Sequence, residues 1–534
     1  MKVNNNYQHI NGFSISTFFS FISHILPTSR IWFHNLKFDG NFIIHYLLSN
    51  GFVWNNKTKL KNGEFSTLIS FKKIFYSIKV RINNKTFEFV DSSKKINGSI
   101  EDIAKAWNLP ILKGEIDYTM YRPLNHIATD EEIAYINNDT EIAYRVMEYE
   151  YSDNLTAITT ASDCLSLFKE TIGGEKMYRQ LYPVLSIDMD NYIRQAYRGG
   201  LCWVNKKFQG KVLYDVDVYD ENSMYPDKMY RRYLPYGYPE KFEGKYIENP
   251  VYNLYIQRIK VACCLKPKGI ECILLHNQIF QSEYLVSTNN EIIDLTLTSI
   301  DLKLLFDNYE IQYIEYVDGL MFKSSNSMFK KYIEPIYITK STTKGCEKNL
   351  AKLKINGLYG KFAANPINYI IEPKLVDDVV KYDVVGSEYS EPEYTALSAF
   401  VTAYAKEDIL SVLVPNYDFA CYCDTDSAHL LKGYDSSVIQ VDDKKLGYYK
   451  LERTLSKVKY LAQKTYYGYE HMDNKMIEYK KICGASKEVK EHITFKRFVF
   501  GEEFEGKLVP KIVRGGVVLV PTTFTLKDRK KGHK

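Results

Sequence analysis

Two short apolar segments meet at an acidic tip between residues 421 and 431. Asp424, Thr425 and Asp426 form the tip, and mostly apolar residues flank it on both sides. This pattern predicts two strands joined by a tight turn. Carboxylates at positions i and i+2 of such a tip can bind Mg²⁺, which prefers oxygen ligands. The alternative is an ordinary polar turn, because Asp and Ser are common in turns.

A second acidic segment stands at the end of another predicted strand. Residues 212–218 alternate apolar and acidic side chains, which predicts a half-buried strand that ends near Asp220. Backbone N–H groups in the following turn can face a phosphate, while Asp220 reaches a cation. The alternative is that the Asp, Asn and Ser side chains of this segment only cap a helix.

A long helix is predicted from about residue 342 to residue 362. Spacings of four, four and three residues place one polar set on a single face of this helix, namely Lys348, Lys352, Asn356 and Tyr359. Leu350, Leu353 and Gly357 fall on the opposite face and can pack. Lys340 lies just before the helix, so a cationic face could meet a triphosphate and its base. A solvated amphipathic helix is the more common use of this pattern.

Together the three segments match the needs of phosphoryl transfer. Two cations, Mg²⁺ or Mn²⁺, held by carboxylates can stabilise the attacking 3′-oxygen and the leaving pyrophosphate. Lysines can neutralise the charge that moves toward the leaving group. The residues therefore predict a nucleotidyltransferase to which the protein contributes position and electrostatics.

The same segments resemble the DxxSxYP, Kx3NSxYG and YxDTDS motifs of family B DNA polymerases. Residues 197–200 resemble that family's YxGG element, which contacts the template, and Lys464 with Tyr466 resembles its KxY element, which holds the primer end. The protein-primed branch of small linear-genome bacteriophages is the most similar. The resemblance implies a DNA-directed DNA polymerase that replicates a linear viral or plasmid genome from a terminal protein primer, processively and with strand displacement.

The resemblance also implies a multi-domain α/β (α+β) chain, in which an RNase H-like exonuclease domain precedes a right-hand polymerase. The expected parts are an exonuclease-like domain (1–160), the palm (161–231 and 395–485), a first insertion that contacts terminal protein and DNA (232–327), the fingers (328–363), a second insertion for processivity and strand displacement (364–394), and the thumb with a basic tail (486–534).

Site roles follow from the resemblance, position by position. Metal binding is expected of Asp220, Asp426 and the Glu221 carbonyl, and catalysis of Asp220, Asp424, Asp426 and Lys352. Contacts to the incoming nucleotide are expected from Glu221, Tyr225, Lys340, Lys348, Lys352, Asn356 and Tyr359. Tyr225 would exclude a ribose 2′-OH, and Tyr359 would pack on the nascent base pair. DNA contacts are expected from Tyr197, Gly199, Gly200, Lys464 and Tyr466. Gly357 departs from the family pattern, which has Ser there.

The N-terminal third resembles the family's 3′–5′ exonuclease. Its pattern predicts a strand at 31–33, a helix from about residue 39, a strand at 81–90 and a helix at 130–151 with Asp130 as N-cap. By resemblance, catalytic positions remain at Asp39, Lys113, Tyr135 and Asp139, and the single strand would be held by Asn35, Phe38, Ser92 and Tyr118. The family's first motif, Asp-x-Glu, is absent, because residues 1–34 contain no Asp or Glu.

Composition bears on the partners and the compartment. The net charge of +5 is modest, although an acidic catalytic site would offset a basic groove. The 45 Tyr residues suit base stacking or reflect an AT-rich gene. Nine Cys without paired CxxC units argue against zinc and disulfides.

The segment 13–27 predicts a packed helix, not a membrane span. We expect a soluble monomer in the host cytoplasm that binds template-primer DNA, dNTPs and a terminal protein.

Three other functions share part of this sequence pattern. A catalytically inactive DNA-binding replication factor of the same fold would not need the acids at 220, 424 and 426. An RNA-templated or RNA-making polymerase can use a similar acidic hairpin, but the lysine-bearing helix precedes the hairpin here. A nuclease alone would need the missing N-terminal acids.

Weak or absent proofreading is the first testable expectation. Asp39 and Asp139 alone would hold a pair of cations poorly, because the first motif normally supplies further ligands. The measurement is the removal of mismatched 3′ nucleotides from a labelled primer. Robust Mg²⁺-dependent degradation would refute the expectation. A late start codon, a truncated gene or genuine loss would each account for the missing motif.

Overall fold

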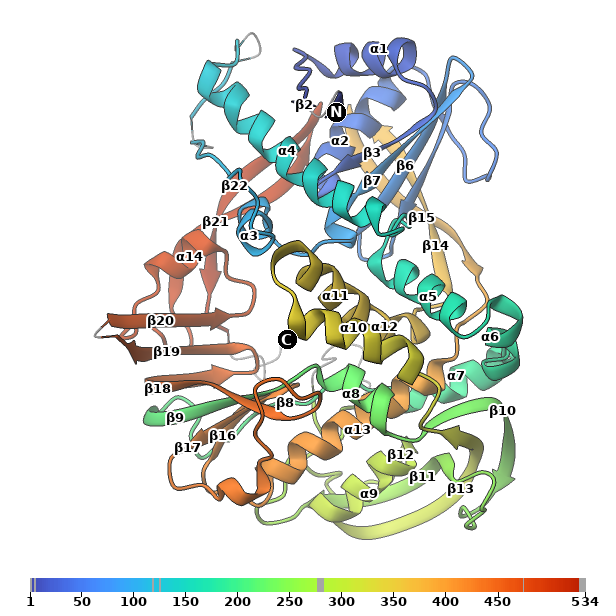
Figure 1. Ribbon diagram of the computed structural model, residues 1–534, viewed down its shortest axis with the longest axis vertical. Coiled ribbons are helices and arrows are strands. Elements are labelled where there is room, and N and C mark those ends of the chain that lie inside the picture. Colours follow the sequence, from blue (N-terminus) through green and yellow to red (C-terminus); the bar gives the residue numbers. More distant parts are fainter. Residues whose placement is uncertain are drawn as a thin grey trace.

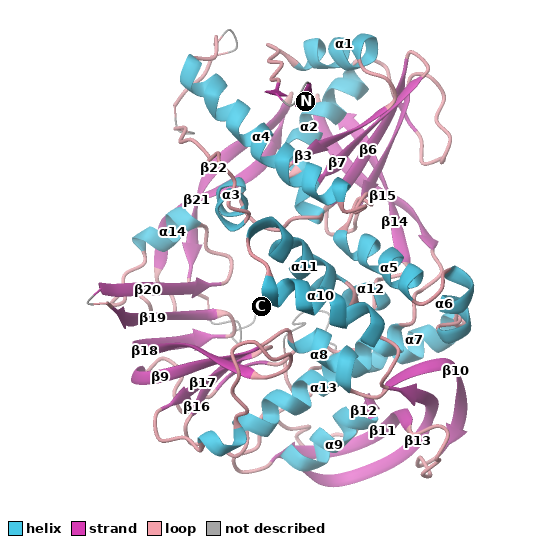
Figure 2. Ribbon diagram, in the orientation of Figure 1, coloured by secondary structure: helices cyan, strands magenta, loops and turns pink. Residues whose placement is uncertain are grey.

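The computed structural model describes most of the chain, namely residues 2–3, 6–117, 120–123, 126–275, 283–473 and 475–527. Figure 1 shows three larger β-sheets around a central group of helices, and Figure 2 shows helix and strand mixed throughout. The expected α/β architecture is therefore confirmed. Among the described helices, none has the length and apolar character that crossing a membrane requires.

The N-terminal unit is built on a five-stranded sheet with the order β3-β7-β6-β5-β4. The strands of this unit are β1 (Lys2–Val3), β2 (Asn6–Tyr7), β3 (Ser29–Phe33), β4 (Val53–Trp54), β5 (Glu64–Ile69), β6 (Phe75–Ile82) and β7 (Lys85–Asp91). Helices α1 (Ile15–Ile25) and α2 (Leu36–Ser49) share one apolar core with the sheet. These elements confirm the predicted strand at 31–33 and the helices predicted at 13–27 and near residue 39.

The single strand predicted at 81–90 is wrong, because a hairpin turn lies inside it. β6 ends at Ile82 and β7 begins at Lys85, and the two residues are paired across the turn. Asn83 and Asn84 between them have φ angles of 49° and 63°. Left-handed backbone at both turn residues is favourable for Asn and matches the twist of a hairpin.

The helix predicted at 130–151 is confirmed as α4 (Asp130–Ser152), but its N-cap is Thr129 and not Asp130. The Glu132 N–H donates to Thr129 Oγ1 at 3.3 Å, and the Thr129 N–H donates to Glu132 Oε2 at 3.0 Å. This reciprocal capping satisfies two N–H groups, whereas Asp130 only adds favourable charge to the first turn.

The helices that precede and follow α4 in the sequence are η1 (Ser92–Lys94), α3 (Ile100–Ala106), α5 (Thr160–Thr171), α6 (Glu175–Leu181) and α7 (Ile187–Ala196).

The second sheet has the antiparallel order β20-β19-β18-β9-β17-β16-β8. Its strands are β8 (Cys202–Val204), β9 (Val212–Glu221), β16 (Ala420–Asp424), β17 (Ser427–Leu431), β18 (Tyr449–Ala462), β19 (Thr465–Met472) and β20 (Lys475–Ile482). The predicted acidic hairpin is confirmed as β16–β17. The half-buried strand predicted at 212–218 is confirmed in position, but residues 216–219 are buried on both faces because β9 is a central strand. Helices α8 (Met224–Arg231) and α13 (Thr395–Leu413) pack behind this sheet.

The other named strands of the described residues form one sheet and two hairpins. The sheet has the order β10-β13-β11-β12. Its elements are β10 (Leu234–Glu243), β11 (Leu254–Leu265), β12 (Ile293–Thr298), β13 (Tyr309–Ser325) and α9 (Ser299–Asn308). The hairpins are β14 (Ile367–Val376) with β15 (Val379–Tyr389), and β21 (Glu503–Val513) with β22 (Gly516–Thr525). Two short helices, η2 (Ser436–Val438) and α14 (Lys487–His492), lie in the last third of the chain. In the basic tail, residues 528–534 lie outside the described residues.

The two hairpins meet the N-terminal unit at one point. Asp378, between β14 and β15, lies 2.9 Å from His45 Nε2 of α2 and 3.3 Å from Arg514 Nε, between β21 and β22. Figure 1 shows both hairpins reaching the N-terminal unit along opposite sides of the molecule. Three segments that are distant in sequence therefore contact one another around one carboxylate.

The helix predicted at 342–362 is confirmed over most of its range, but it is divided in two. α11 (Gly345–Gly357) and α12 (Tyr359–Phe362) occupy that range, and α10 (Lys330–Thr342) precedes them. Thr343 and Lys344 are extended and break the helix between α10 and α11. The predicted division of faces holds within α11, where Lys348, Lys352 and Asn356 are exposed and Leu350 is buried.

Gly357 packs so closely on α5 that a side chain does not fit. A Cβ added there would lie 2.6 Å from Cys164 Sγ and 3.3 Å from Thr160 Cγ2. Cys164 is fully buried, and its thiol donates to the Leu353 carbonyl at 3.6 Å. The absence of the family's Ser at this position therefore follows from the close approach of α5 to α11.

Gly357→Ser is expected to destabilise the protein by about 1–3 kcal/mol, because overpacking forces buried groups to move. Thermal unfolding measures the change. Cys164→Ala in the same chain removes the thiol that the new side chain would meet. The double variant should therefore unfold at a higher temperature than Gly357→Ser alone. A Gly357→Ser protein as stable as the parent, or no recovery in the double variant, would contradict this account.

Candidate functional site

Asp220 and Asp426 come together because β9 and β17 are neighbouring strands. Asp220 pairs in register with Ser427, and the Glu221 N–H donates to the Asp426 carbonyl at 2.8 Å. The turn itself is tight, since the Asp426 N–H donates to the Asp424 carbonyl at 2.9 Å and Thr425 has a φ of 65°. The structure thus brings the predicted acidic tip to the predicted strand end.

The Asp220 and Asp426 carboxylates lack a basic partner among the described residues. Burial, with the nearby Asp426 carboxylate, raises the pKa of Asp220 to about 7. Burial also raises the pKa of Asp426. No ion pair within 4 Å joins either carboxylate to a described Lys or Arg. Two half-buried acids that form no ion pair with the described basic residues are a donor set that fits a divalent cation such as Mg²⁺.

Asp424 has different surroundings from the other two acids. Its Oδ1 accepts from Cys202 Sγ at 3.0 Å and lies 3.1 Å from Lys464 Nζ, while Oδ2 lies 3.5 Å from Lys481 Nζ. Burial alone would raise the pKa of Asp424, but the thiol and the two ammonium groups outweigh it and lower the pKa. Asp424 is therefore an ion-pair partner that connects the acidic tip to β19 and β20.

Three lysines gather near Asp220 on the side of α10 and α11. Burial, with the nearby Lys352 and Lys348, lowers the pKa of Lys340, and Asp220 opposes this effect. Lys340 Nζ also donates to Ser223 Oγ, at the start of α8. Clustered positive charges create a favourable site for a polyanion such as a triphosphate.

Aromatic residues lie beside the acidic tip and the three lysines. The rings of Tyr225 and Tyr359 lie 4.1 Å apart between centroids. Burial, with the nearby Tyr359, raises the pKa of Tyr197 to about 12. A Cβ on Gly200 would lie 2.6 Å from Thr425 Cγ2 and 2.7 Å from Tyr225 Oη, so only glycine fits there. The predicted residues at 197, 200, 225 and 359 therefore converge, while Gly199 faces open space.

A cleft of about 790 Å³ leads from the acidic tip along β18, β19 and β20. Tyr466 and Lys464, both predicted, line it. Several further charged residues of this cleft were not predicted from the sequence, namely Glu452, Arg453, Lys480, Lys481 and Lys490. Lys481 is paired with Tyr466 across the β19–β20 hairpin. The register of that hairpin would have indicated their shared face, because directly opposed residues point the same way.

Glu221 directs its side chain away from the cleft. Among the described residues, Glu221, Asp227 and Asp408 are the one set of three acids close enough to share a cation. Lys228 already lies among them, with Nζ at 2.6 Å from Glu221 Oε1 and 3.0 Å from Asp227 Oδ2. An ammonium group therefore takes the place of a metal ion in this second acidic cluster.

Among the predicted exonuclease residues, Lys113, Tyr135 and Asp139 form a separate group. Lys113 Nζ lies 3.6 Å from Asp139 Oδ2 and 5.3 Å from the centre of the Tyr135 ring. Burial, with the nearby Asp91, raises the pKa of Asp39 to about 6. Within the described part of the chain, no third acid joins Asp39 and Asp139 in a set tight enough to share a cation.

The residues expected to hold a single strand differ in exposure. Asn35 is exposed and its N–H donates to Asp91 Oδ1 at 3.0 Å. Phe38 is half-buried, with its ring 5.7 Å from that of Phe42. Ser92 is buried, and its hydroxyl contacts His34 Nδ1 at 3.1 Å. Tyr118 lies outside the described residues.

The chain is similar in sequence and in structure to known DNA polymerases. The family model for "DNA polymerase type B, organellar and viral" matches residues 27–130 and 121–445. The DNA polymerase of Bacillus phage Nf is 39% identical over 99% of this chain and 96% of its own length. The structure of phi29 DNA polymerase complexed with primer-template DNA and incoming nucleotide substrates has 36% identity and a TM-score of 0.89. That match covers 96% of this chain and 93% of the phi29 chain.

Asp220→Asn is expected to make the metal-free protein more stable at alkaline pH. A raised pKa means that the folded state binds the proton more tightly than the unfolded state, so the contribution of Asp220 to stability is lost as pH rises through about 7. At pH 8 the variant should gain about 1–2 kcal/mol of unfolding free energy, a value reduced by solvent screening. The gain should disappear near pH 4, below which both states are protonated.

Chemical denaturation in EDTA at both pH values measures this effect. Asp215→Asn is the matched control, because Asp215 lies on the same strand and is exposed. The control should change stability little at either pH. An Asp220→Asn protein that is less stable than the parent at pH 8 would refute the electrostatic account.

Proposed function

We propose that this chain, which belongs to the family of organellar and viral type B DNA polymerases and is a DNA-directed DNA polymerase, extends primers by two-metal-ion nucleotidyl transfer at Asp220 and Asp426. The observation that carries the proposal is a pair of half-buried carboxylates that lack a basic partner in the described residues and stand opposite a group of lysines. Opposed groups of this kind are what a cation and a polyphosphate need together.

The chain's own residues divide the work of the reaction. Asp220 and Asp426 would hold the divalent cations, with the Glu221 carbonyl assisting. When bound, these ions stabilise the attacking 3′-oxygen and the leaving pyrophosphate. Lys340, Lys348 and Lys352 would orient the triphosphate and neutralise its charge. This division is supported by the surroundings of Lys340. Burial and the nearby Lys352 and Lys348 lower the pKa of Lys340, and Asp220 opposes that lowering.

Aromatic side chains would select the nucleotide. Tyr359 would pack on the nascent base pair, and Asn356 would contact the nucleotide from the adjacent turn of α11. Tyr225 would exclude a 2′-OH, because its ring is held against Tyr359 and its hydroxyl lies near Gly200. A side chain confined in this way has little room to move away from a ribose.

Primer and template would occupy the lysine-lined cleft. Lys464 and Tyr466 would hold the primer end, with Asp424 keeping Lys464 in place through their 3.1 Å ion pair. Tyr197, Gly199 and Gly200 would contact the template. Basic and aromatic residues along one surface are the usual means of holding a nucleic-acid strand.

We further propose protein-primed replication of a linear genome, with the domain boundaries and exonuclease remnant given above. The β10–β13 sheet within residues 232–327 would contact terminal protein and DNA. The β14–β15 hairpin within residues 364–394 would support processivity and strand displacement. This second assignment is supported by the contact of Asp378 with His45 and Arg514, which links the hairpin to two other parts of the chain.

Primer extension with Mg²⁺ and dNTPs tests the proposed chemistry. Asp426→Ala should reduce extension by at least about 100-fold, because a metal ligand that stabilises developing charge is lost. Asp188→Ala, at an exposed position of α7, is the matched control and should extend like the parent. An Asp426→Ala protein with parental activity would exclude the metal assignment. Labelling of a candidate terminal protein by dNTP without a DNA primer tests the priming step, and no labelling would count against it.

A further inference from the structure

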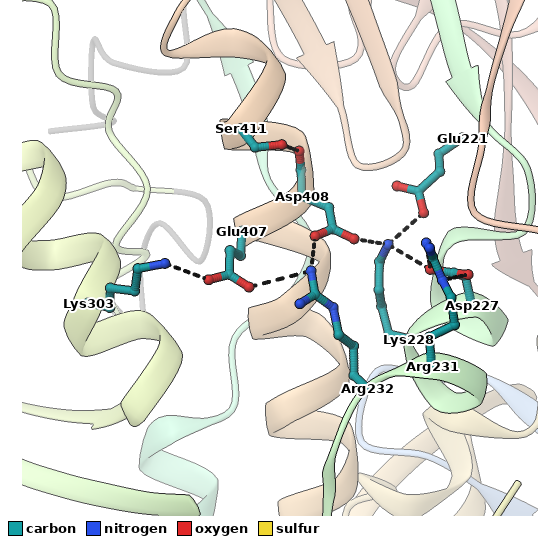
Figure 3. A network of polar contacts seen from close by, with 9 residues as sticks. All are labelled: Glu221, Asp227, Lys228, Arg231, Arg232, Lys303, Glu407, Asp408 and Ser411. Carbon is teal, nitrogen blue, oxygen red and sulfur yellow. Dashed lines mark hydrogen bonds and ion pairs between the residues drawn. The ribbon is translucent and has the colours of Figure 1, made fainter. Parts of the chain in front are cut away.

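A buried lysine, Lys228, holds three carboxylates together (Figure 3), and one of them, Glu221, follows Asp220 at the end of β9. Successive residues on a strand point to opposite faces, so Asp220 lines the cleft while Glu221, 1% exposed, points inward. Lys228 of α8 is fully buried, and its Nζ donates to Glu221 Oε1 at 2.6 Å, to Asp227 Oδ2 at 3.0 Å and to Asp408 Oδ2. An ammonium group has three N–H donors, so each finds one carboxylate.

Outer residues balance the charge of this cluster. Arg231 donates to both Asp227 oxygens, at 2.5 and 2.7 Å. Arg232 pairs with Asp408 and lies 3.5 Å from Glu407, to which Lys303 donates at 2.9 Å. Four acids (Glu221, Asp227, Glu407, Asp408) thus face four bases (Lys228, Arg231, Arg232, Lys303). Exposure rises outward to 62% for Lys303, so the network runs from a dry centre to a solvated rim.

The cluster joins three elements that build the candidate site. Glu221 ends β9, Lys228 lies on α8, and Asp408 lies on α13, as Figure 3 shows. The first turn of α8 carries Tyr225, and Ser223 just before it accepts from Lys340. Lys228 therefore attaches α8 one turn beyond Tyr225. Glu221 attaches β9 one residue beyond Asp220.

Stability alone does not account for such a cluster. Desolvation of buried charges offsets much of their attraction, and apolar residues of similar size often stabilise a core at least as well. Charged hydrogen bonds instead specify one arrangement, because displacement of any member leaves a buried charge unpaired. A network with this property suits a place where small displacements reduce the reaction rate.

We propose that Lys228 is a positioning residue for nucleotidyl transfer. It connects the end of β9 and the first turn of α8 to α13, which keeps the spacing between the Asp220 carboxylate and the Tyr225 ring constant. Lys228 touches neither substrate nor metal ion and acts through these two residues. The inference rests on the proposed function of Asp220.

Steady-state dNTP and rNTP incorporation by Lys228→Met tests this inference. At a temperature where circular dichroism shows the variant folded, kcat for dNTP should fall by about tenfold or more, because a displacement of about 1 Å at the reacting groups has effects of this size or larger. The Kd for primer-template DNA should stay within about twofold, since the cluster lies behind the cleft. The ratio of rNTP to dNTP incorporation should rise, because Tyr225 is no longer held in place. Lys176→Met, at an exposed position of α6 outside the cluster, is the matched control and should match the parent in all three measurements.

A charge-balanced variant separates position from stability. Lys228→Met with Asp408→Asn removes one charge of each sign, so it should unfold at a higher temperature than Lys228→Met while keeping its low kcat. Recovery of kcat together with stability would overturn the proposal, and so would parental kcat in Lys228→Met.

Asp408→Asn alone serves if both Lys228 variants fail to fold. It keeps two partners of Lys228, so kcat should fall about threefold with an unchanged KM for dNTP, and parental kcat would overturn the proposal. Failure of the underlying function has a different signature, because Asp426→Ala would then remain active whatever the Lys228 variants do.

Discussion

The antiparallel pairing of β9 with β17 is the constraint on which the rest of the site depends. It places the Asp220 and Asp426 carboxylates side by side in a half-buried position, where burial and like charge disfavour ionisation of both. Such an arrangement persists only when surrounding structure enforces it. Burial of residues 216–219 on both faces of the sheet supplies that enforcement, because a shift in register would expose an apolar core.

Three acids close together in space have three different electrostatic roles, which their partners decide. Asp220 faces the cleft without a basic partner in the described residues and fits a cation. Asp424 is held by Cys202, Lys464 and Lys481 and keeps an ordinary negative charge. Glu221 is neutralised by Lys228 behind the sheet. Residue type alone would make these three acids equivalent. Their surroundings make Asp220 a candidate metal ligand, Asp424 an ion-pair partner of two lysines, and Glu221 a buried partner of Lys228.

Errors in the sequence-based predictions have identifiable physical causes. The strand predicted at 81–90 contained a turn, because Asn83 and Asn84 interrupt the pattern without Gly or Pro. Thr129 replaced Asp130 as N-cap because Glu132 completes a reciprocal capping pair with it. The helix predicted from 342 to 362 begins only at Gly345, because Thr343 and Lys344 before it are extended and Gly345 itself has a φ of 58°. Lys481 was missed because its place in the cleft depends on hairpin register, which the local sequence leaves open.

Local patterns in the sequence determined the class of architecture, the acidic hairpin, the strand that leads to Asp220 and the exposed lysine face of α11, because each depends on residues within a few positions of one another. The five-motif order also determined the family, which the comparisons confirm. Tertiary structure alone decided which distant groups share a charge environment. The pairing of Lys228 with Asp408, 180 residues away, and the exclusion of a side chain at Gly357 by Cys164 depend on helix packing in three dimensions. No local pattern encodes such contacts, because burial and electrostatic partners are properties of the folded chain.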